Sequence, residues 1–242
     1  MDLEGFAKRG LKKGEKNLEA KLARRILEIK NVSKQHAFGL ARAVVSEARA
    51  TLSPKSGLLT FYNSGITMGD LGVGSRGTGD FYAHRKIAEV IGKTGAVIDS
   101  SHLDDAGAVK NFGKFIVVAV DGMHSRLSDF PFLAGFHAAR ASLRDVYVMG
   151  ASPVALFSDV HVADDGDVSK IFDYVAGIAS VSEACNVPYV SGSTLRIGGD
   201  MVIGERMTGC VGAIGVAESL TPRKNARVGD VILMTEGSGG GT

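Results

Sequence analysis

Apolar side chains recur every three or four residues along the first fifty positions, which is the spacing of one face of a helix. One stripe runs from Leu18 to Ile29 and predicts a helix over about residues 15–30. A second helix is expected to begin after Ser33, whose side chain can cap it, and to end before Pro54. This part of the chain is therefore predicted to be a helical hairpin.

Beyond residue 57 the pattern changes to short apolar runs between helical segments. The expected strands are Leu58–Tyr62, Ala96–Ile98, Phe115–Val120, Val154–Val162, Tyr189–Val190, Thr208–Val216 and Val231–Met234. The clearest helices are expected at Phe81–Ile91, Pro131–Met149 and Val168–Cys185. Strict alternation of strand and helix is absent, so the predicted fold class is α+β, with a mixed sheet covered by helices.

Charge divides the chain at the same place. Residues 1–57 carry a net charge of +7 and residues 58–242 a net charge of −5, which the overall +2 conceals. With the boundary near Ser53–Gly57, we expect a basic helical extension (1–56), a larger domain (57–225) and the start of another domain (226–242). A basic helical pair could bind nucleic acid if its cations converged on one face. A solvated pair docked on the larger domain is preferred, and nucleic acid is not an expected partner.

Composition excludes several classes of protein. No apolar run approaches the roughly 20 residues of a membrane-spanning helix, and the N-terminus has no apolar signal-peptide core. A cytoplasmic protein without membrane contact is therefore expected. The two cysteines, Cys185 and Cys210, support neither a disulfide framework nor a zinc site.

Glycines concentrate in residues 65–79, where six occur in fifteen positions before a predicted helix. Backbone amides in such a segment can approach phosphate oxygens, because glycine has no Cβ to block them. Gly72, Gly74 and Gly77 fit the spacing Gly-x-Gly-x-x-Gly, but the segment lacks the Gly-Lys-Ser/Thr ending of a P-loop. The nearby Arg76 favours phosphate binding slightly, and a mobile surface loop is the equally weighted alternative.

Acidic residues follow the apolar runs. Asp104 and Asp105 come after the run at 96–98, Asp121 ends the run at 115–120, and Asp145 lies on a helix among small or apolar neighbours. An isolated carboxylate on such a face carries a large desolvation penalty, so a cation is its natural partner. Carboxylates from strand ends and a helix can converge on Mg²⁺, which prefers oxygen ligands.

The alternative is that each acid caps a turn or pairs with an arginine. Arg140 and Arg144 lie on the same predicted helix as Asp145. Taken singly, each acid is more readily explained in this way than as a metal ligand.

Three motifs, in this order and at these separations, resemble the aminoimidazole ribonucleotide (AIR) synthetase superfamily. They are Asp-Asp-Ala-Gly-Ala-Val at 104–109, Val-Val-Ala-Val-Asp-Gly-Met-His-Ser-Arg at 117–126 and Leu-Arg-Asp-Val-Tyr-Val-Met-Gly-Ala-Ser-Pro at 143–153. The resemblance continues through Val-Ser-Gly-Ser-Thr-Leu-Arg at 190–196 and Arg-Val-Gly-Asp at 227–230, and covers roughly residues 70–242. The superfamily includes thiamine monophosphate kinases and selenophosphate synthetases.

The resemblance implies an ATP-using fold in which the sheets of two amino-terminal domains pair, with nucleotide and Mg²⁺ near the pairing surface. By this analogy Asp105, Asp121 and Asp145 are metal ligands. The residues implied to contact the nucleotide are Gly72, Gly74, Arg76, Gly77, Gly79 and Asp104. The implied catalytic residues are Asp121, Arg126 and Arg196.

This sequence departs from the pattern in three ways. Ser193 stands where the kinase branch has a carboxylate, which Asp200 could replace. The glycine-rich segment has no cysteine, so chemistry of the selenophosphate type is not expected. The superfamily continues into a second α/β domain, so this chain is expected to be an amino-terminal fragment or a natural half.

The expected function is that of an ATP- and Mg²⁺-dependent enzyme, a homodimer, which phosphorylates a small acceptor or activates it through phosphate. The alternative is a nucleotide-binding regulatory or assembly protein without turnover. A third possibility is that the basic helices recruit RNA or an acidic protein partner to the larger domain.

Overall fold

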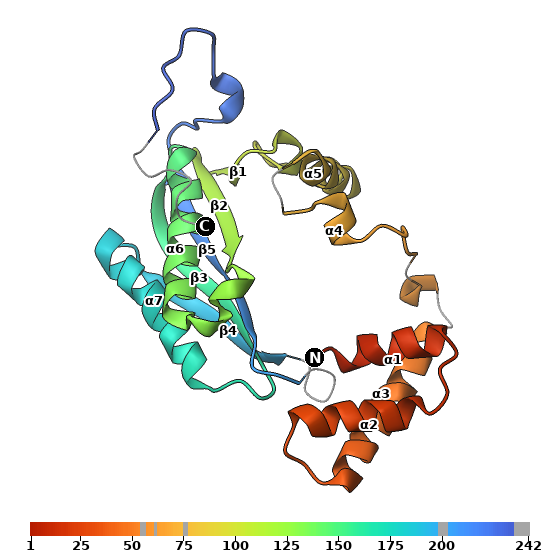
Figure 1. Cartoon of the computed structure of the whole chain (residues 1–242). Coiled ribbons are helices and arrows are strands. Elements are labelled where there is room, and N and C mark those ends of the chain that lie inside the picture. Colours follow the sequence, from red (N-terminus) through yellow and green to blue (C-terminus); the bar gives the residue numbers. More distant parts are fainter. Residues whose placement is uncertain (54–56, 61, 75–76, 198–202, 235–242) are drawn as a thin grey trace.

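The computed structural model describes residues 1–53, 57–60, 62–74, 77–197 and 203–234. A group of helices at the N-terminus stands beside a five-stranded sheet that carries two long helices on one face (Figure 1). An arm of short helices, orange to yellow in Figure 1, connects the two parts. In the described part of the chain, every helix is too short or too polar to cross a lipid bilayer.

The N-terminal group consists of α1 (Leu3–Lys12), α2 (Leu18–Ile29) and α3 (Lys34–Leu52). Both predicted helices are present, and the Ser33 side chain caps α3 by accepting a hydrogen bond from the His36 N–H. The N-terminal group has one helix that was not predicted, α1, which precedes the predicted hairpin. Gly5 and Gly10 lie inside α1 and lower its intrinsic helix preference, which packing against α3 offsets.

Two sets of contacts tie this helical group to the body that contains the sheet. The Met1 amine donates to the Ile203 carbonyl, and the Ile203 N–H donates to the Met1 carbonyl over 3.2 Å. The Lys30 ammonium donates to the Asp164 carboxylate and lies 3.2 Å from Asp165 Oδ1. The hydrogen bond to Asp164 is the main reason that the pKa of Lys30 is raised.

The connecting arm contains η1 (Gly57–Leu59), α4 (Met68–Leu71), α5 (Thr78–Ile91) and η2 (Ser100–His102). Helix α5 confirms the helix predicted at 81–91 and begins three residues earlier. The strand predicted at Leu58–Tyr62 is wrong for the described residues, because 57–59 form a 3₁₀ turn and neither Thr60 nor Tyr62 is in a strand. Leu58 is almost fully exposed, so this apolar run is not covered in the described structure.

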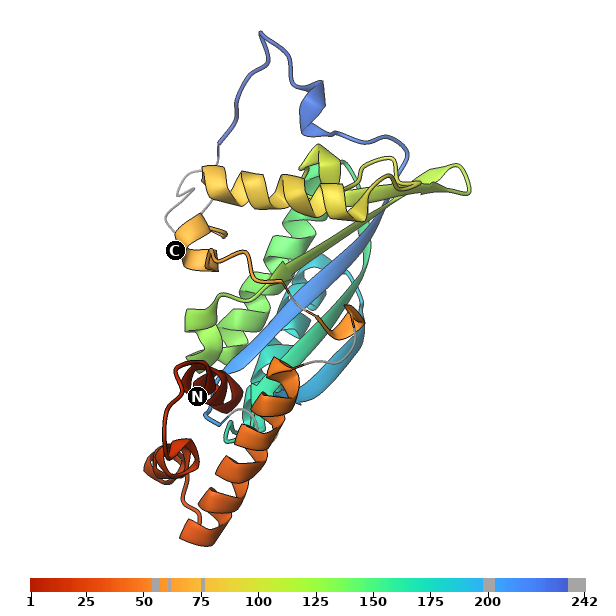
Figure 2. The same ribbon diagram turned by 90° about the vertical axis from the view of Figure 1, so that its right-hand side faces the viewer.

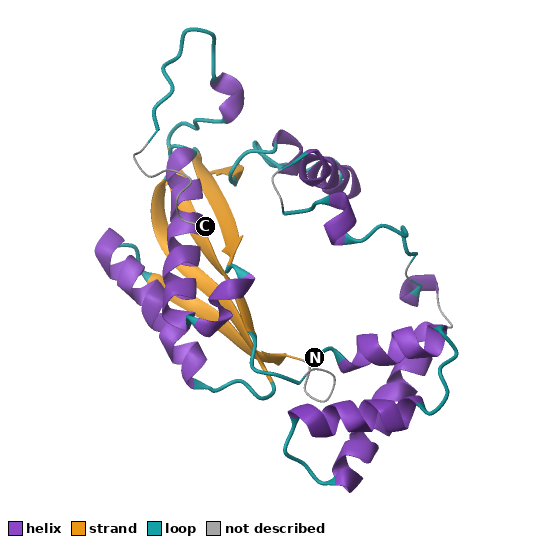
Figure 3. Ribbon diagram, viewed as in Figure 1, coloured by secondary structure: helices purple, strands orange, loops and turns teal. Residues whose placement is uncertain are grey.

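The sheet contains β1 (Gly107–Asn111), β2 (Lys114–Gly122), β3 (Ser152–Ala163), β4 (Tyr189–Ile197) and β5 (Met207–Ala217). Their order is β1-β2-β5-β3-β4. Strands β3 and β4 are parallel and the other neighbours are antiparallel, so the predicted α+β class with a mixed sheet is confirmed (Figure 3).

Strands β2, β3 and β5 match their predicted runs, and β4 is longer than expected. Strand β1 was not predicted. It forms a hairpin with β2 through Phe112 and Gly113, whose φ angles of 48° and 80° suit a two-residue turn.

Two further predicted strands are not formed. Of Ala96–Ile98, only Ile98 makes an isolated bridge, to Ala108. Residues 231–234 belong to no strand, and Ile232 is 94% exposed. An apolar run becomes a strand only where another strand offers its backbone N–H and C=O groups.

One face of the sheet is covered by α6 (Pro131–Val148) and α7 (Ser169–Cys185), as Figure 2 also shows. The short helices η3 (Ser125–Asp129) and η4 (Arg223–Asn225) lie at its margins. Helices α6 and α7 approach closely at two glycines. A Cβ on Gly135 would lie 2.0 Å from the Tyr174 carbonyl oxygen, and one on Gly177 would lie 2.0 Å from the Phe132 carbonyl oxygen.

Candidate carboxylate site

Asp121 and Asp145 reach the site from the two layers of the fold. Asp121 lies near the end of β2, opposite Val211 of β5 and on the same face as Val117 and Ala119. This face packs against α6, the helix that carries Asp145 near its C-terminal end. The side chain of Asp145 is only 12% exposed.

Arg144 contacts both carboxylates. Its Nη2 and Nε atoms donate to Asp145 Oδ1 over 2.8 and 3.0 Å, and Nη2 lies 3.8 Å from Asp121 Oδ2. The alternative interpretation of these two acids, pairing with Arg144, therefore describes what the structure contains. Arg144 itself is 60% exposed, so its guanidinium reaches the pair from the solvent side.

Burial governs the electrostatics of this pair. Desolvation raises the pKa of Asp145, the Arg144 guanidinium opposes that rise, and the charges of Asp121 and Asp105 add to it. The pKa of Arg144 is raised, first by its hydrogen bond to Asp145 and then by the charges of all three carboxylates. Asp105 is exposed, and its charge makes the smallest contribution to both shifts.

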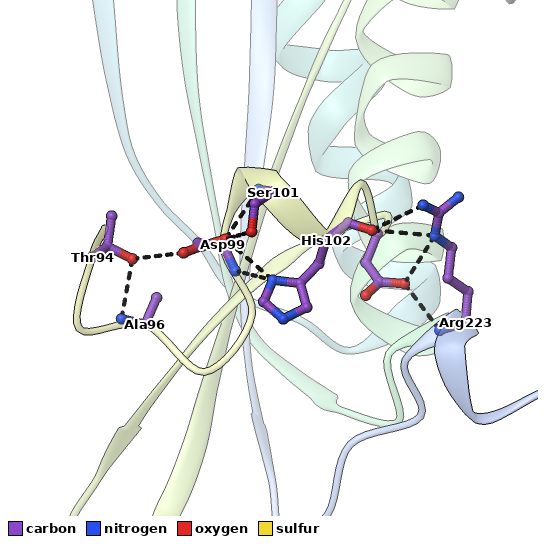
Figure 4. A network of polar contacts seen from close by, with 7 residues as sticks. Thr94, Ala96, Asp99, Ser101, His102 and Arg223 are labelled. Atoms are coloured by element: carbon purple, nitrogen blue, oxygen red, sulfur yellow. Dashed lines mark hydrogen bonds and ion pairs between the residues drawn. The ribbon is translucent and has the colours of Figure 1, made fainter. Parts of the chain in front are cut away.

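The neighbouring Asp104 is directed elsewhere. Its side chain is only 2% exposed, and its Oδ1 accepts a hydrogen bond of 2.9 Å from the backbone N–H of Arg223. The Arg223 guanidinium donates to the carbonyl oxygen of His102, over 3.2 Å from Nε and 3.0 Å from Nη2. These contacts, drawn in Figure 4, join the turn before β1 to a segment more than a hundred residues later.

A second set of contacts fixes the other side of that turn. Asp99 accepts hydrogen bonds from Thr94 and from the hydroxyl and N–H of Ser101, and its own N–H donates to His102 Nδ1 (Figure 4). The hydrogen bonds from Ser101 are the main reason that the pKa of Asp99 falls to about 2. The turn that carries Asp104 and Asp105 is thus held at both ends.

The three carboxylates suit Mg²⁺ in chemistry, since they offer oxygen donors and already attract one cation. Their spacing does not suit it. In the described part of the chain, no three side chains of His, Cys, Asp or Glu lie close enough together to hold one metal ion. Convergence of Asp105, Asp121 and Asp145 on a metal stays a prediction.

The described residues of the glycine-rich segment form α4, a turn at 72–74 and the start of α5. Gly72 and Gly74 have φ angles of 74° and 84°, a conformation that favours glycine. A Cβ on Gly79 would lie 1.6 Å from the Leu71 carbonyl oxygen, so that glycine permits close packing of α4 on α5. Gly77 stands at the N-cap of α5, and Arg76 lies outside the described residues. Phosphate binding here stays a prediction.

The other predicted residues lie on separate elements. Arg126 is exposed on η3, and its N–H donates to His124 Nδ1. Arg196 is on β4, with its Nη1 3.3 Å from Asp164 Oδ1. Ser193 is exposed on β4, opposite Asp159 of β3. Asp200, named above as a possible substitute for a carboxylate, lies outside the described residues.

One segment of the chain carries the three motifs, the sheet and the two carboxylates on β2 and α6. It can be compared with known families. Residues 103–217 match the family described as AIR synthase related protein, N-terminal domain. This segment is an AIR synthase related domain. The family predicted from the three motifs is thereby confirmed for the part of the chain that carries them.

Several curated proteins are similar to the chain. An uncharacterized protein of Methanocaldococcus jannaschii is 55% identical over 100% of this chain and 57% of its own length. A thiamine-monophosphate kinase of Pyrococcus horikoshii is 29% identical over 54% of this chain and 42% of its length. A selenide, water dikinase of Myxococcus xanthus is 27% identical over 60% of this chain and 40% of its length. The chain thus spans about half the length of these relatives.

The fold also matches a solved structure. The complex of AaThiL with AMPPCP and TMP is 20% identical, covers 63% of this chain and 45% of that chain, and has a TM-score of 0.50. At this identity the match shows a similarity of fold alone.

Two features of the site were not predicted from the sequence. Arg223 lies outside the three motifs, and no local pattern connects it with Asp104, 119 positions earlier. Asp164 connects Lys30 of the helical group with Arg196. The only sequence feature that points to Asp164 is the group of acidic residues directly after β3.

Proposed function

We propose that this chain forms the ATP- and Mg²⁺-binding part of an enzyme that phosphorylates a small acceptor or activates it through phosphate. The observation that carries the proposal is the grouping of Asp121 and Asp145 around one guanidinium, within the electric field of Asp105, in an AIR synthase related domain. The names of two relatives, a kinase and a dikinase, support phosphoryl transfer as the class of reaction.

Each group of residues has a separate role in this proposal. Asp105, Asp121 and Asp145 are not close enough together in the described structure to hold one ion, so they would have to converge to bind Mg²⁺. The bound ion would supply positive charge to phosphate oxygens. Burial of Asp145 strengthens the attraction of its carboxylate for any cation, because the local dielectric constant is lower than that of water. Asp104 would support the turn that presents Asp105.

Two arginines and the glycine-rich segment would contact the phosphates. Arg126 is exposed and its guanidinium can approach an anion directly. The positive charge of Arg196 is shared with Asp164, so Arg196 would contact phosphate only after that ion pair loosens. Backbone amides at Gly77 and Gly79, with the side chain of Arg76, would orient the nucleotide. The amides of Gly72 and Gly74 would do so only after leaving their present acceptors, the Met68 carbonyl and Asp80 Oδ1. Catalysis would then consist mainly of positioning and charge stabilisation.

The exposed face of the sheet supports a homodimer. Val118, Val120 and Leu195 are 44%, 63% and 56% exposed on strands β2 and β4. Apolar patches of this kind commonly mark association surfaces. A second copy of the chain would cover this face and bring the two sites into one assembly.

A nucleotide screen tests the proposal. The full chain is titrated with ATP, ADP and GTP by calorimetry, with and without Mg²⁺, and products formed with candidate acceptors are identified by mass spectrometry. Binding of ATP that strengthens with Mg²⁺ is the expected result. Absence of nucleotide binding in the presence of Mg²⁺ would contradict it.

A regulatory or assembly protein without turnover is the second candidate. Two observations favour it: Ser193 provides a hydroxyl in place of a carboxylate, and Arg196 is already paired with Asp164. This candidate predicts Mg²⁺-dependent nucleotide binding with no product from any acceptor. Formation of ADP at a rate above that of an Asp121→Asn variant would exclude it.

A further inference from the structure

The helical group and the sheet share one acidic side chain. Asp164, in the turn after β3, accepts a hydrogen bond from the Lys30 ammonium at the C-terminal end of α2. The other oxygen of the same carboxylate, Oδ1, lies 3.3 Å from Nη1 of Arg196 on β4. One carboxylate therefore contacts two cations, of which one belongs to the helical group and the other to the sheet.

The exposure of the three side chains shows which cation can leave. Asp164 is 17% exposed and Lys30 is 22% exposed, whereas Arg196 is 69% exposed. Asp165 Oδ1 lies 3.2 Å from the Lys30 ammonium and holds it from a second direction. Partly buried charges attract each other more strongly than exposed ones, because water screens them less. Lys30 is thus the fixed partner of Asp164, and Arg196 is the partner that can move into solvent.

A separate contact keeps the helical group, and with it Lys30, beside Asp164. Ile203 precedes β5 in the sheet body, is 1% exposed and packs among apolar residues of the helical group. Its backbone exchanges two hydrogen bonds with the backbone of Met1. A substitution of Lys30 therefore changes the charge next to Asp164 while this second attachment stays in place.

The two cations compete for the charge of one carboxylate. With Lys30 in place, part of the Asp164 charge is neutralised, so the attraction between Asp164 and Arg196 is weaker. Without Lys30, the whole charge of a largely buried carboxylate would act on Arg196 and hold the guanidinium more tightly. A free guanidinium can donate two parallel hydrogen bonds to a phosphate group, whereas a paired guanidinium must first leave its partner.

We propose that Lys30 is a positioning residue, which keeps Arg196 available to a phosphate group by neutralising Asp164. This inference rests on the phosphate contact of Arg196 in the proposed function and needs no metal ion. It gives the helical group a role in binding, because the docking of this group is coupled to the affinity of Arg196 for an anion. Loss of Lys30 should therefore weaken anion binding through Asp164, and only while Asp164 is charged.

The test is a double-mutant cycle read by calorimetry on the full chain. Inorganic tripolyphosphate is the probe, without divalent metal ions and at low salt, where charges are screened least. Lys30→Met is expected to lower the affinity about threefold and Asp164→Asn to raise it about threefold, the size of effect of one exposed charge pair. In the Asp164→Asn background, Lys30→Met should have no effect. An equal loss in both backgrounds would be a general effect of net charge and would overturn the proposal.

Asp165→Asn is the matched control. Asp165 lies beside Lys30, and its contacts in the described part of the chain are with Lys30 and Gly204, not with Arg196. Its substitution removes the same charge as Asp164→Asn and should change the tripolyphosphate affinity by less than about 1.5-fold. A gain equal to that of Asp164→Asn would overturn the proposal.

Arg196→Gln shows where the probe binds. This variant should bind tripolyphosphate more weakly than the wild type and should no longer respond to Lys30→Met. If Arg196→Gln binds as tightly as the wild type, the anion binds at other cations of the chain and the proposal fails.

Two comparisons cover the case in which Lys30→Met folds poorly, which thermal melts would show. Lys30→Arg keeps the positive charge and should retain the affinity of the wild type. If Lys30→Met does not fold, the comparison of Asp164→Asn with Asp165→Asn decides, and equal affinities would overturn the proposal.

Failure of this inference is distinguishable from failure of the proposed function. ATP binding in Mg²⁺, with an effect of Lys30→Met that does not depend on Asp164, would contradict the role of Lys30 alone. The expected tripolyphosphate cycle, with no nucleotide binding by any form, would support the role of Lys30 and contradict the proposed function. Absence of tripolyphosphate binding by the wild type would overturn this inference, and the ATP titration would still decide the proposed function.

Discussion

Strand β2 carries apolar side chains on both faces of the sheet, and the two faces have opposite surroundings. On the face under α6 and α7, Val117, Leu156 and Val211 are completely buried. On the other face, Val118 and Val120 alternate with the buried residues of β2 and are 44% and 63% exposed. An antiparallel sheet with one solvated face normally alternates apolar and polar residues. The run Phe-Ile-Val-Val-Ala-Val at 115–120 is instead typical of a strand that is covered on both faces.

The two faces of β2 therefore have different roles. The covered face positions Asp121 against α6, so it builds the carboxylate site inside a single chain. The open face has no cover among the described elements, and its apolar side chains favour association with a second copy. A mutation on the first face should therefore act on folding, and a mutation on the second should act on assembly.

The largest effect is expected where α6 and α7 touch. Gly135→Ala would bring a Cβ within 2.0 Å of the Tyr174 carbonyl oxygen, so the two helices must separate. A loss of about 3 kcal/mol or more in the free energy of unfolding is expected. Urea denaturation measures it. Gly39→Ala is the control, since its Cβ meets nothing within 4 Å on α3 and should stabilise the chain by up to about 1 kcal/mol.

On the open face, Val120→Asp should prevent association with little effect on the fold of the monomer. A charge at the centre of an apolar interface must be desolvated without a partner, so the dimer dissociation constant should rise by about a hundredfold. Sedimentation velocity over a concentration series measures it. Val90→Asp on α5, 88% exposed outside the sheet, should leave association unchanged. A wild type that is monomeric at all concentrations would remove the proposed dimer.

Asp121→Asn tests whether the covered face holds a binding group or a structural one. Arg144 is exposed and its guanidinium lies 3.8 Å from Asp121. Removing the Asp121 charge should therefore change the free energy of unfolding by no more than about 1 kcal/mol. Nucleotide binding in Mg²⁺ should weaken strongly. Thermal melts with and without Mg²⁺ and ATP separate the two effects, with the exposed Asp129→Asn as the control. A strongly destabilised variant without ligands would contradict the assignment of Asp121 to a metal.

The smallest effect is expected at Asp99, beside the edge strand β1. Its pKa is lowered to about 2, so the stabilisation that it contributes is present above the ordinary pKa of 3.8 and is lost as pH falls through about 2. At pH 6 the melting temperature of Asp99→Asn should therefore be lower than that of the wild type. The two melting temperatures should converge as the pH falls towards 2. Melting temperatures across this pH range measure the difference. A difference that persists at pH 2 would mean that the effect does not arise from the charge of Asp99.

Much of the fold could be predicted from local patterns. The strands β2 and β5 contain long runs of apolar residues and glycine, β3 begins with a shorter apolar run at 154–157, and α6 and α7 have long periodic stripes. Each of these elements is therefore predictable from its own residues. The runs at 58–62 and 231–234 have the same local character and form no strand in the described structure. Their failure shows that a strand needs a partner, which local pattern does not supply.

The amino-acid sequence by itself determined the α+β class, the AIR synthase related motifs and the acidic residues that belong to them. Tertiary structure alone decided which charge each acid meets: Asp145 meets Arg144 beside it, and Asp104 meets Arg223, 119 positions away. The physical reason is that helix and strand periodicity depend on neighbours within a few residues, whereas burial and charge pairing depend on the distance between atoms in space. Only the folded chain sets that distance.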